Sequence, residues 1–137
     1  MLIIVDRDMS KFFVHWEAPL EHWIRLNIDG VSKGNLGVIG AGGILRGHYG
    51  NWIKGFAINL GTCTYVKAEL TALIKGLRLA KSQGVSQLII HTDSQVVLSK
   101  MKTSLQRNKE YYHHVKESQE LLHNPDWKVI LEHCLCE

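Results

Sequence analysis

Three consecutive stretches in the first half of the chain have patterns typical of strands, and in two of them hydrophobic and polar residues alternate. Residues 24–28 place isoleucine and leucine on one face, residues 39–46 form a glycine-rich apolar stretch, and residues 52–59 alternate again. A period of two is typical of a half-buried strand, because successive side chains point to opposite faces of a sheet. Gly, Ser and Asn dominate residues 30–37, and residues 47–50 contain two glycines, so both segments are expected to be turns. Strands with such short connections predict an antiparallel meander.

The second half of the chain changes to a helical period. Apolar residues recur at helical spacing over residues 66–82, and weaker helical patterns cover residues 94–105 and 109–122. Residues 87–92 form a short apolar run of the kind found in buried parallel strands, and residues 127–132 predict a fifth strand. This order predicts an α/β fold, a mixed five-stranded sheet of three antiparallel and two parallel strands flanked by helices.

The first twenty residues show no sustained period and include Pro19. We therefore expect residues 1–20 to be an irregular N-terminal arm or the remnant of a linker, and residues 21–137 to form one domain. A chain of 137 residues, 45% of them hydrophobic, is large enough for one compact core. No apolar run approaches the roughly 18 residues that a membrane span needs. The apolar start is interrupted at Asp6, so no secretory signal and no membrane partner are predicted.

Charge and cysteine content narrow the choice of partner and compartment only slightly. The net charge of +3 permits a polyanionic partner without requiring one. Three cysteines are too few for a disulfide framework, which favours a reducing, intracellular compartment, nuclear or cytoplasmic. His133-Cys134-Leu135-Cys136 could form half of a zinc site but lacks a second ligand pair, so an ordinary strand end is the favoured interpretation. The oligomeric state is left open.

The glycine-rich stretch does not match a phosphate-binding loop. Leu45 follows Gly40-x-Gly42 where a dinucleotide fingerprint has its third glycine, and no glycine precedes Lys and then Ser or Thr. Small residues here instead indicate that another backbone or a ligand approaches the sheet closely.

Three acidic residues stand at the ends of predicted elements. Asp29 follows the first strand, Asp93 follows the fourth, and Glu69 borders the apolar face of the long helix. If the first and fourth strands are parallel neighbours, Asp29 and Asp93 lie side by side at one sheet edge, where ligands of α/β folds gather. Converging carboxylates repel each other, and a hard divalent cation with oxygen ligands relieves that repulsion. The residues therefore allow a metal site.

Each acidic residue also has a purely structural interpretation. Asp93 before Ser94 could belong to a helix start, and Glu69 gains from the positive end of its helix. Asp29-Gly30 could be a simple turn. From the residues alone these alternatives remain open.

The same motifs resemble those of type-1 ribonuclease H. The three acids are separated by 40 and 24 residues (29 to 69 and 69 to 93), which suits that fold. The segment from Trp16 to Gly30 is similar to the plant branch of the family, which is found at the end of retroelement reverse transcriptases. The likeness covers about residues 14–137. Its motifs are Asp29-Gly30-Val31-Ser32-Lys33-Gly34-Asn35-Leu36-Gly37, Gly40-Ala41-Gly42-Gly43-Ile44-Leu45-Arg46, Ala68-Glu69-Leu70 and Thr92-Asp93-Ser94.

The resemblance implies hydrolysis of the RNA strand of RNA–DNA hybrids by two Mg²⁺ ions, or by Mn²⁺ in their place. It makes Asp29, Glu69 and Asp93 the metal ligands and catalytic carboxylates. It matches His133 with a mobile histidine that helps water delivery or product release. It also implies that Asn35 contacts the minor groove of the nucleic acid and that Ser94 supports a phosphate or the site.

The sequence departs from the family pattern at several points. The family has a fourth acidic ligand about ten residues beyond the position of His133, followed by a closing helix, whereas this sequence stops at Glu137, at a position that binds no metal in the family. Tyr65 and Val66 stand where many relatives have asparagines, and Leu36 replaces a usual proline. Two rival hypotheses therefore accompany the nuclease: a catalytically impaired nucleic-acid-binding remnant, and a protein-interaction domain that keeps only the scaffold.

The remaining aromatic and basic residues are given ordinary structural roles. Trp52, Phe56 and Trp127 are expected to be core or sheet-face residues and not base-stacking platforms. His113-His114 is expected on a solvated helix face, because neighbouring residues do not share a face of a helix. Lysines and arginines over residues 100–109 are expected to be exposed.

Overall fold

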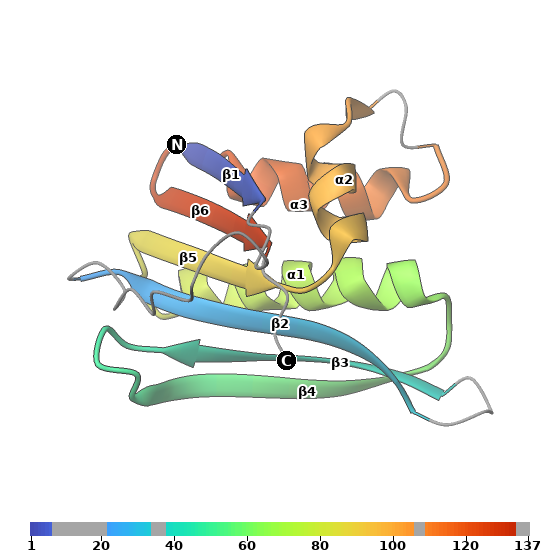
Figure 1. Cartoon of the computed structure of the whole chain (residues 1–137), viewed down its shortest axis with the longest axis horizontal. Helices are drawn as coiled ribbons and strands as arrows, with labels where there is room; N and C mark the ends of the chain where they lie inside the picture. Colours follow the sequence, from blue (N-terminus) through green and yellow to red (C-terminus); the bar gives the residue numbers. More distant parts are fainter. Residues whose placement is uncertain (7–21, 34–37, 106–108, 134–137) are drawn as a thin grey trace.

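The computed structural model describes residues 1–6, 22–33, 38–105 and 109–133 (Figure 1). These residues form six strands and three helices. The elements in chain order are β1 (Leu2–Asp6), β2 (Ile24–Lys33), β3 (Val38–Arg46), β4 (Trp52–Thr62), α1 (Tyr65–Ser82), β5 (Gln87–Thr92), α2 (Gln95–Lys102), α3 (Tyr112–Leu122) and β6 (Lys128–His133).

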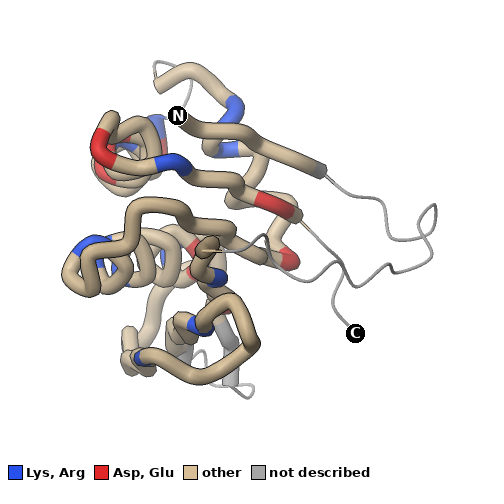
Figure 2. Tube along the Cα trace, turned by 90° about the vertical axis from the view of Figure 1, so that its left-hand side faces the viewer, with Lys and Arg blue, Asp and Glu red and all other residues tan. Residues whose placement is uncertain are grey.

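One mixed sheet carries all six strands in the order β1-β6-β5-β2-β3-β4. The meander β2–β3–β4 is antiparallel, whereas β1, β6, β5 and β2 run parallel to their neighbours. Helix α1 packs on β2 and β3 and against α3, and Figure 2 shows helices stacked on one side of the sheet. The predicted mixed α/β sheet flanked by helices is therefore confirmed, with one strand more than expected.

The additional strand is β1, which corrects the expectation of an irregular arm for residues 2–6, whereas residues 7–20 of that arm lie outside the described residues. Leu2–Asp6 pairs in parallel with β6, in register from Leu2 opposite Val129. The Met1 ammonium group donates a hydrogen bond to the Trp127 carbonyl oxygen (3.0 Å), which fixes the start of the strand. Four consecutive apolar residues are compatible with an edge strand of a parallel sheet. They do not alternate with polar residues, so a search for a period of two does not identify them as a strand.

Strand β2 also continues further than predicted. Gly30 was expected to begin a turn, but it pairs with Ala41, and the pairing of β2 with β3 runs on to Lys33 opposite Val38. Strand β2 thus includes Asp29-Gly30, because the cross-strand hydrogen bonds outweigh the turn preference of these two residues, and residues 34–37 of the predicted turn lie outside the described residues. Helix α2 ends at Lys102 and α3 begins at Tyr112, so both are shorter than the predicted ranges.

The apolar face of α1 builds the core above β2. Leu70, Leu73 and Leu77 are completely buried. Gly76 brings the helix close to the sheet, since a Cβ there would lie 2.7 Å from Leu26 Cδ2. Thr64 caps the helix by accepting a hydrogen bond from the Lys67 N–H (3.2 Å). The packing of these leucines and of Gly76 fixes the position of α1 relative to β2.

The three aromatic residues that were assigned to the core or a sheet face differ in exposure. Trp127 is buried, and its Nε1–H donates to the Leu121 carbonyl oxygen (2.9 Å). Phe56 is half-buried beneath Gly43. Trp52 lies on the sheet but is 62% exposed, so it is no core residue. In the described part of the chain, no helix combines the length and apolar character required to cross a membrane.

Candidate metal centre

Three carboxylates from separate elements meet at one edge of the sheet. Asp29 belongs to β2, Asp93 follows directly after β5, and Glu69 is on the second turn of α1. β2 and β5 are parallel neighbours with Asn27 opposite His91, so Asp29 and Asp93 leave the sheet side by side, as the strand-end argument predicts. One carboxylate oxygen from each residue lies within 4.8 Å of the others. The structure therefore brings the three predicted ligands together.

Gly30 allows Glu69 to reach this cluster. A Cβ at Gly30 would lie 2.9 Å from the Glu69 backbone nitrogen and 3.0 Å from the Ala68 carbonyl carbon. Such distances are shorter than van der Waals contact, so the first turns of α1 can approach β2 only because residue 30 has no side chain. This is the close approach that small residues in the sheet indicated, at a position one strand away from the glycine run.

The Glu69 carboxylate is buried without enough hydrogen bonds to offset the cost of burying its charge. Its side chain is completely inaccessible, and neither oxygen accepts a hydrogen bond of normal geometry from the residues that the structure describes. Burial raises the pKa of Glu69, and the charges of Asp29 and Asp93 raise it further. The Tyr65 hydroxyl and the Gly30 N–H face this carboxylate and offset only part of the rise. A buried anion in this state requires a cation or a proton.

The pKa of Asp29 is raised as well. Burial and then the nearby charge of Asp93 raise the pKa of its carboxyl group. Three carboxylates that converge and repel one another, one of them with both oxygens buried and unpartnered among the described residues, match what a hard divalent cation binds. Asp29, Glu69 and Asp93 therefore fit a site for a hard divalent cation.

Ser94 and His133 lie next to Asp93 and contact the backbone around it. Ser94 is buried and caps α2, because its Oγ accepts from the Val97 N–H (3.2 Å) while its own N–H donates to Thr92 Oγ1 (3.1 Å). His133 ends β6, is 2% exposed, and has its Nε2 at 3.1 Å from the Asp93 carbonyl oxygen. Their roles toward substrate stay predictions, and Asn35, like Cys134 and Cys136, lies outside the described residues.

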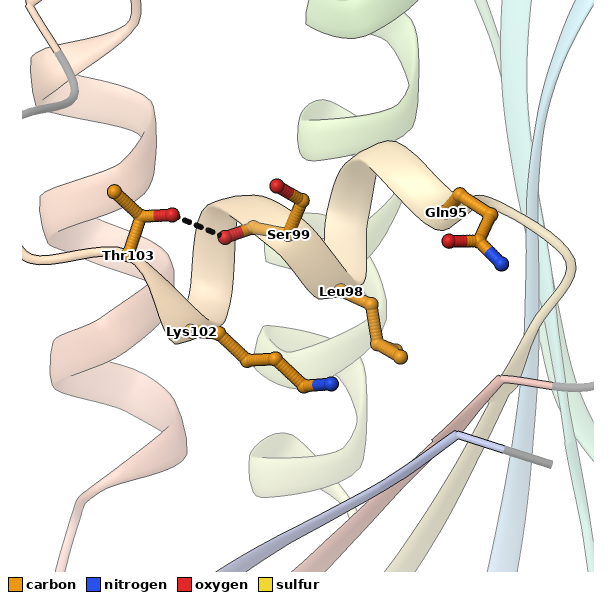
Figure 3. A pocket seen from close by; sticks show the side chains of 5 residues that line it. All are labelled: Gln95, Leu98, Ser99, Lys102 and Thr103. Carbon is orange, nitrogen blue, oxygen red and sulfur yellow. Dashed lines mark hydrogen bonds between the residues drawn. The ribbon is translucent and has the colours of Figure 1, made fainter.

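A separate hollow of about 270 Å³ lies along α2 (Figure 3). Its lining consists of Gln95, Leu98, Ser99, Lys102 and Thr103. The Thr103 hydroxyl donates to the Ser99 carbonyl oxygen (2.7 Å), and Lys102 contributes a single positive charge. None of the three clustered carboxylates lines it, so this hollow is distinct from the candidate metal centre.

Comparison with known proteins identifies the family. Residues 27–137 match the family described as reverse transcriptase-like. The chain belongs to this reverse transcriptase-like family. An Arabidopsis thaliana protein named "Putative ribonuclease H protein" is 33% identical over 105 residues, which are 77% of this chain and 17% of that protein. The chain thus spans about a sixth of its curated relative.

Solved structures show that the reverse transcriptase-like chain has the ribonuclease H fold. RNase H1 from Halobacterium salinarum superposes with a TM-score of 0.70 at 23% identity, covering 82% of this chain and 85% of that one. A compost-derived RNase H1 in complex with an RNA/DNA hybrid superposes with a TM-score of 0.58 at 22% identity, covering 80% and 83%. At these identities the likeness concerns the fold alone.

The raised carboxyl pKa values predict an unusual pH dependence of stability without metal. Folding raises the pKa of Asp29 and Glu69 above their ordinary values of 3.8 and 4.5, so their charged forms destabilise the fold. The penalty is complete above the raised values and disappears as the pH falls through them. We expect Asp29→Asn, measured by urea unfolding in EDTA, to stabilise the protein at neutral pH and to lose this advantage near pH 4. A pH-independent difference would contradict the expectation.

Proposed function

We propose that this chain is a metal-dependent ribonuclease H-type endonuclease that cleaves the RNA strand of RNA–DNA hybrids. The observation that carries the proposal is the convergence of Asp29, Glu69 and Asp93, with the buried Glu69 oxygens lacking hydrogen-bond partners among the described residues. The match to the reverse transcriptase-like family and the hybrid-bound neighbour support a nucleic-acid substrate. We further propose a plant retroelement origin, which the Arabidopsis relative supports.

The three carboxylates would hold Mg²⁺, or Mn²⁺, against the scissile phosphate. Bound there, such ions lower the pKa of a water nucleophile and stabilise the leaving oxygen. The chain's own part is to aim the three carboxylates at one point. Gly30 sets the approach of Glu69, and the Ser94 cap with the His133 contact holds the backbone of Asp93. Choice of the RNA strand would depend on its 2′-hydroxyl groups.

The proposal predicts divalent-metal-dependent cleavage of a labelled hybrid. Wild-type protein with Mg²⁺ or Mn²⁺ should cut only the RNA strand, EDTA should stop the reaction, and a DNA duplex of the same sequence should stay intact. Gel electrophoresis of both end-labelled strands measures these outcomes. Salt-sensitive hybrid binding without cleavage in either metal would favour the nucleic-acid-binding remnant, and absence of both binding and cleavage would favour the scaffold-only protein.

Metal binding should also be detectable without any substrate. A ligand that binds only the folded state stabilises it by about 2.7 kcal/mol at a hundred times its Kd. We therefore expect Mn²⁺ to raise the thermal midpoint of the wild-type protein but not of Asp29→Asn, since the variant loses one of three clustered ligands. Because ligands must be deprotonated, the wild-type shift should shrink as the pH falls toward the raised carboxyl pKa values.

A further inference from the structure

Trp52 presents most of its indole to solvent on the outer part of the sheet. It is 62% exposed, and the neighbouring Ile44 is 36% exposed. Gly55 lies beside both, because a Cβ there would be 3.6 Å from Trp52 Nε1 and 3.8 Å from Ile44 Cγ1. The indole therefore borders a position without a side chain, and the two apolar groups form one exposed patch. Such patches mark interaction sites more often than isolated surface residues do.

The strand register places this patch on the face of the sheet that carries Asp29. Leu26 of β2 packs against α1, so its neighbours Arg25 and Asn27 point to the opposite face. Direct cross-strand partners share a face, and Asn27 is opposite Ile44. Asp29 follows two residues further along β2 and has the same orientation as Asn27. The patch and the candidate metal centre are therefore accessible from the same side.

Positive charge accompanies the exposed tryptophan. Arg46 is the direct cross-strand partner of Arg25 on β2 and of Trp52 on β4, so the three residues form one row across the sheet. Arg46 Nη1 donates to the Gly50 carbonyl oxygen (3.2 Å), and within the described ranges no carboxylate forms an ion pair with Arg46. A guanidinium group has five N–H donors, so most of them remain for a ligand.

We propose that Trp52 and Arg46 bind an unpaired nucleotide of the substrate, with the indole stacked on the base and the guanidinium on the phosphate. We call these two residues the Trp52 platform. Aromatic stacking combined with a nearby cation is the common chemistry of single-strand recognition, because every base has a π-face and every link a phosphate. The inference rests on the proposed function, because it takes the substrate to be a nucleic acid on this face.

The position of the Trp52 platform indicates which part of a substrate it contacts. Gly42 is opposite Asp29, and Arg46 follows four residues later on β3, at a distance of about 13 Å along the strand. That distance corresponds to roughly four nucleotide steps of a stacked strand. Bases inside a hybrid are paired and cannot stack on the indole, so the Trp52 platform selects substrates with a single-stranded extension a few nucleotides from the cleavage position.

The test compares a blunt hybrid with the same hybrid carrying an extension of about four nucleotides. Fluorescence polarisation in EDTA gives Kd without cleavage. We expect the extension to raise wild-type affinity about fivefold, Trp52→Ala to remove that gain, and Trp52→Phe to retain most of it. Arg46→Gln should reduce the gain and the salt dependence of extended-hybrid binding. All variants should bind the blunt hybrid as the wild type does.

Matched controls lie on the helices. Tyr112→Ala removes another exposed aromatic residue, from α3, and Lys75→Gln another exposed cation, from α1; neither should change the gain. Equal weakening of blunt and extended hybrids by Trp52→Ala, or no effect on either, would overturn the platform. So would a change in sedimentation of Trp52→Ala, which would indicate a protein interface. Cleavage of the blunt hybrid in Mg²⁺ tests the nuclease separately, so the two proposals can fail independently.

Discussion

Replacing Glu69 with glutamine is expected to reduce hybrid cleavage strongly while stabilising the metal-free protein. The carboxylate is fully buried, and both of its oxygens lack hydrogen-bond partners among the described residues, so its charge costs folding energy. Glutamine keeps the shape, removes the charge, and can donate a hydrogen bond toward the Asp29 carboxylate. We expect a stability gain of about 1 kcal/mol in EDTA at neutral pH.

The same change should lower the cleavage rate at least about a hundredfold. A metal centre supplies several kcal/mol of transition-state stabilisation, and each 1.36 kcal/mol is a factor of ten in rate. A neutral amide is a weaker ligand for a hard cation than a carboxylate. Thermal denaturation in EDTA and single-turnover cleavage in Mg²⁺ measure the two effects on one preparation of protein.

Glu117→Gln is the matched control for this experiment. Glu117 pairs with Arg78 between α3 and α1, and both side chains are partly exposed, so the change should alter stability by less than about 1 kcal/mol. Cleavage should be unaffected, because Glu117 lies outside the three-carboxylate cluster. If Glu69→Gln destabilised the metal-free protein, Glu69 would be a structural residue and not a ligand kept at a cost in stability.

Local periodicity was sufficient to predict most of the fold. The alternation of β2 and β4 and the apolar stripe of α1 are strong signals because each of these elements has one buried face. β1 was missed because an edge strand in a parallel sheet needs no alternation. The predicted end of β2 was too early because Asp29-Gly30 has the composition of a turn. Only the pairing of Gly30 with Ala41 shows that the strand continues. Which distant segments pair is decided by the tertiary structure, and local composition does not predict it.

The sequence predicts the part of the candidate site that follows from where the strands end. It does not predict the part that depends on how closely the helix approaches the sheet. Asp29 and Asp93 meet because parallel neighbours end at one edge. The sequence placed Glu69 only at the border of a helical stripe, and its entry into the cluster depends on the missing Cβ of Gly30. The exposure of Trp52 depends on which elements cover the outer face of the sheet, and the sequence does not show this. The expectation that Trp52 would not serve as a stacking platform could therefore not be checked before the structure was known.

Substituting alanine for Gly30 should therefore impair cleavage without touching any ligand. The added Cβ would meet backbone atoms of Ala68 and Glu69 at 2.9–3.0 Å, and backbone cannot move aside as a flexible side chain can. The first turns of α1 must shift away from β2, and Glu69 moves with them. We expect cleavage to fall at least tenfold, since a displacement of about 1 Å can cost a hundredfold, and stability to fall by about 1–3 kcal/mol.

Gly84→Ala separates displacement from general loss of stability. Gly84 follows α1 with φ of +72° and has no neighbouring atom within 4 Å of a Cβ, so alanine there adds backbone strain of about 1–2 kcal/mol and no clash. Urea unfolding gives the stability of both variants, and cleavage is compared at a temperature where both are folded. Equal cleavage by the two variants would mean that the approach of α1 to β2 at residue 30 does not control the site. Impairment confined to Gly30→Ala, together with a smaller Mn²⁺-induced rise of its thermal midpoint, would show that a missing side chain on one strand sets the geometry of a ligand on a helix.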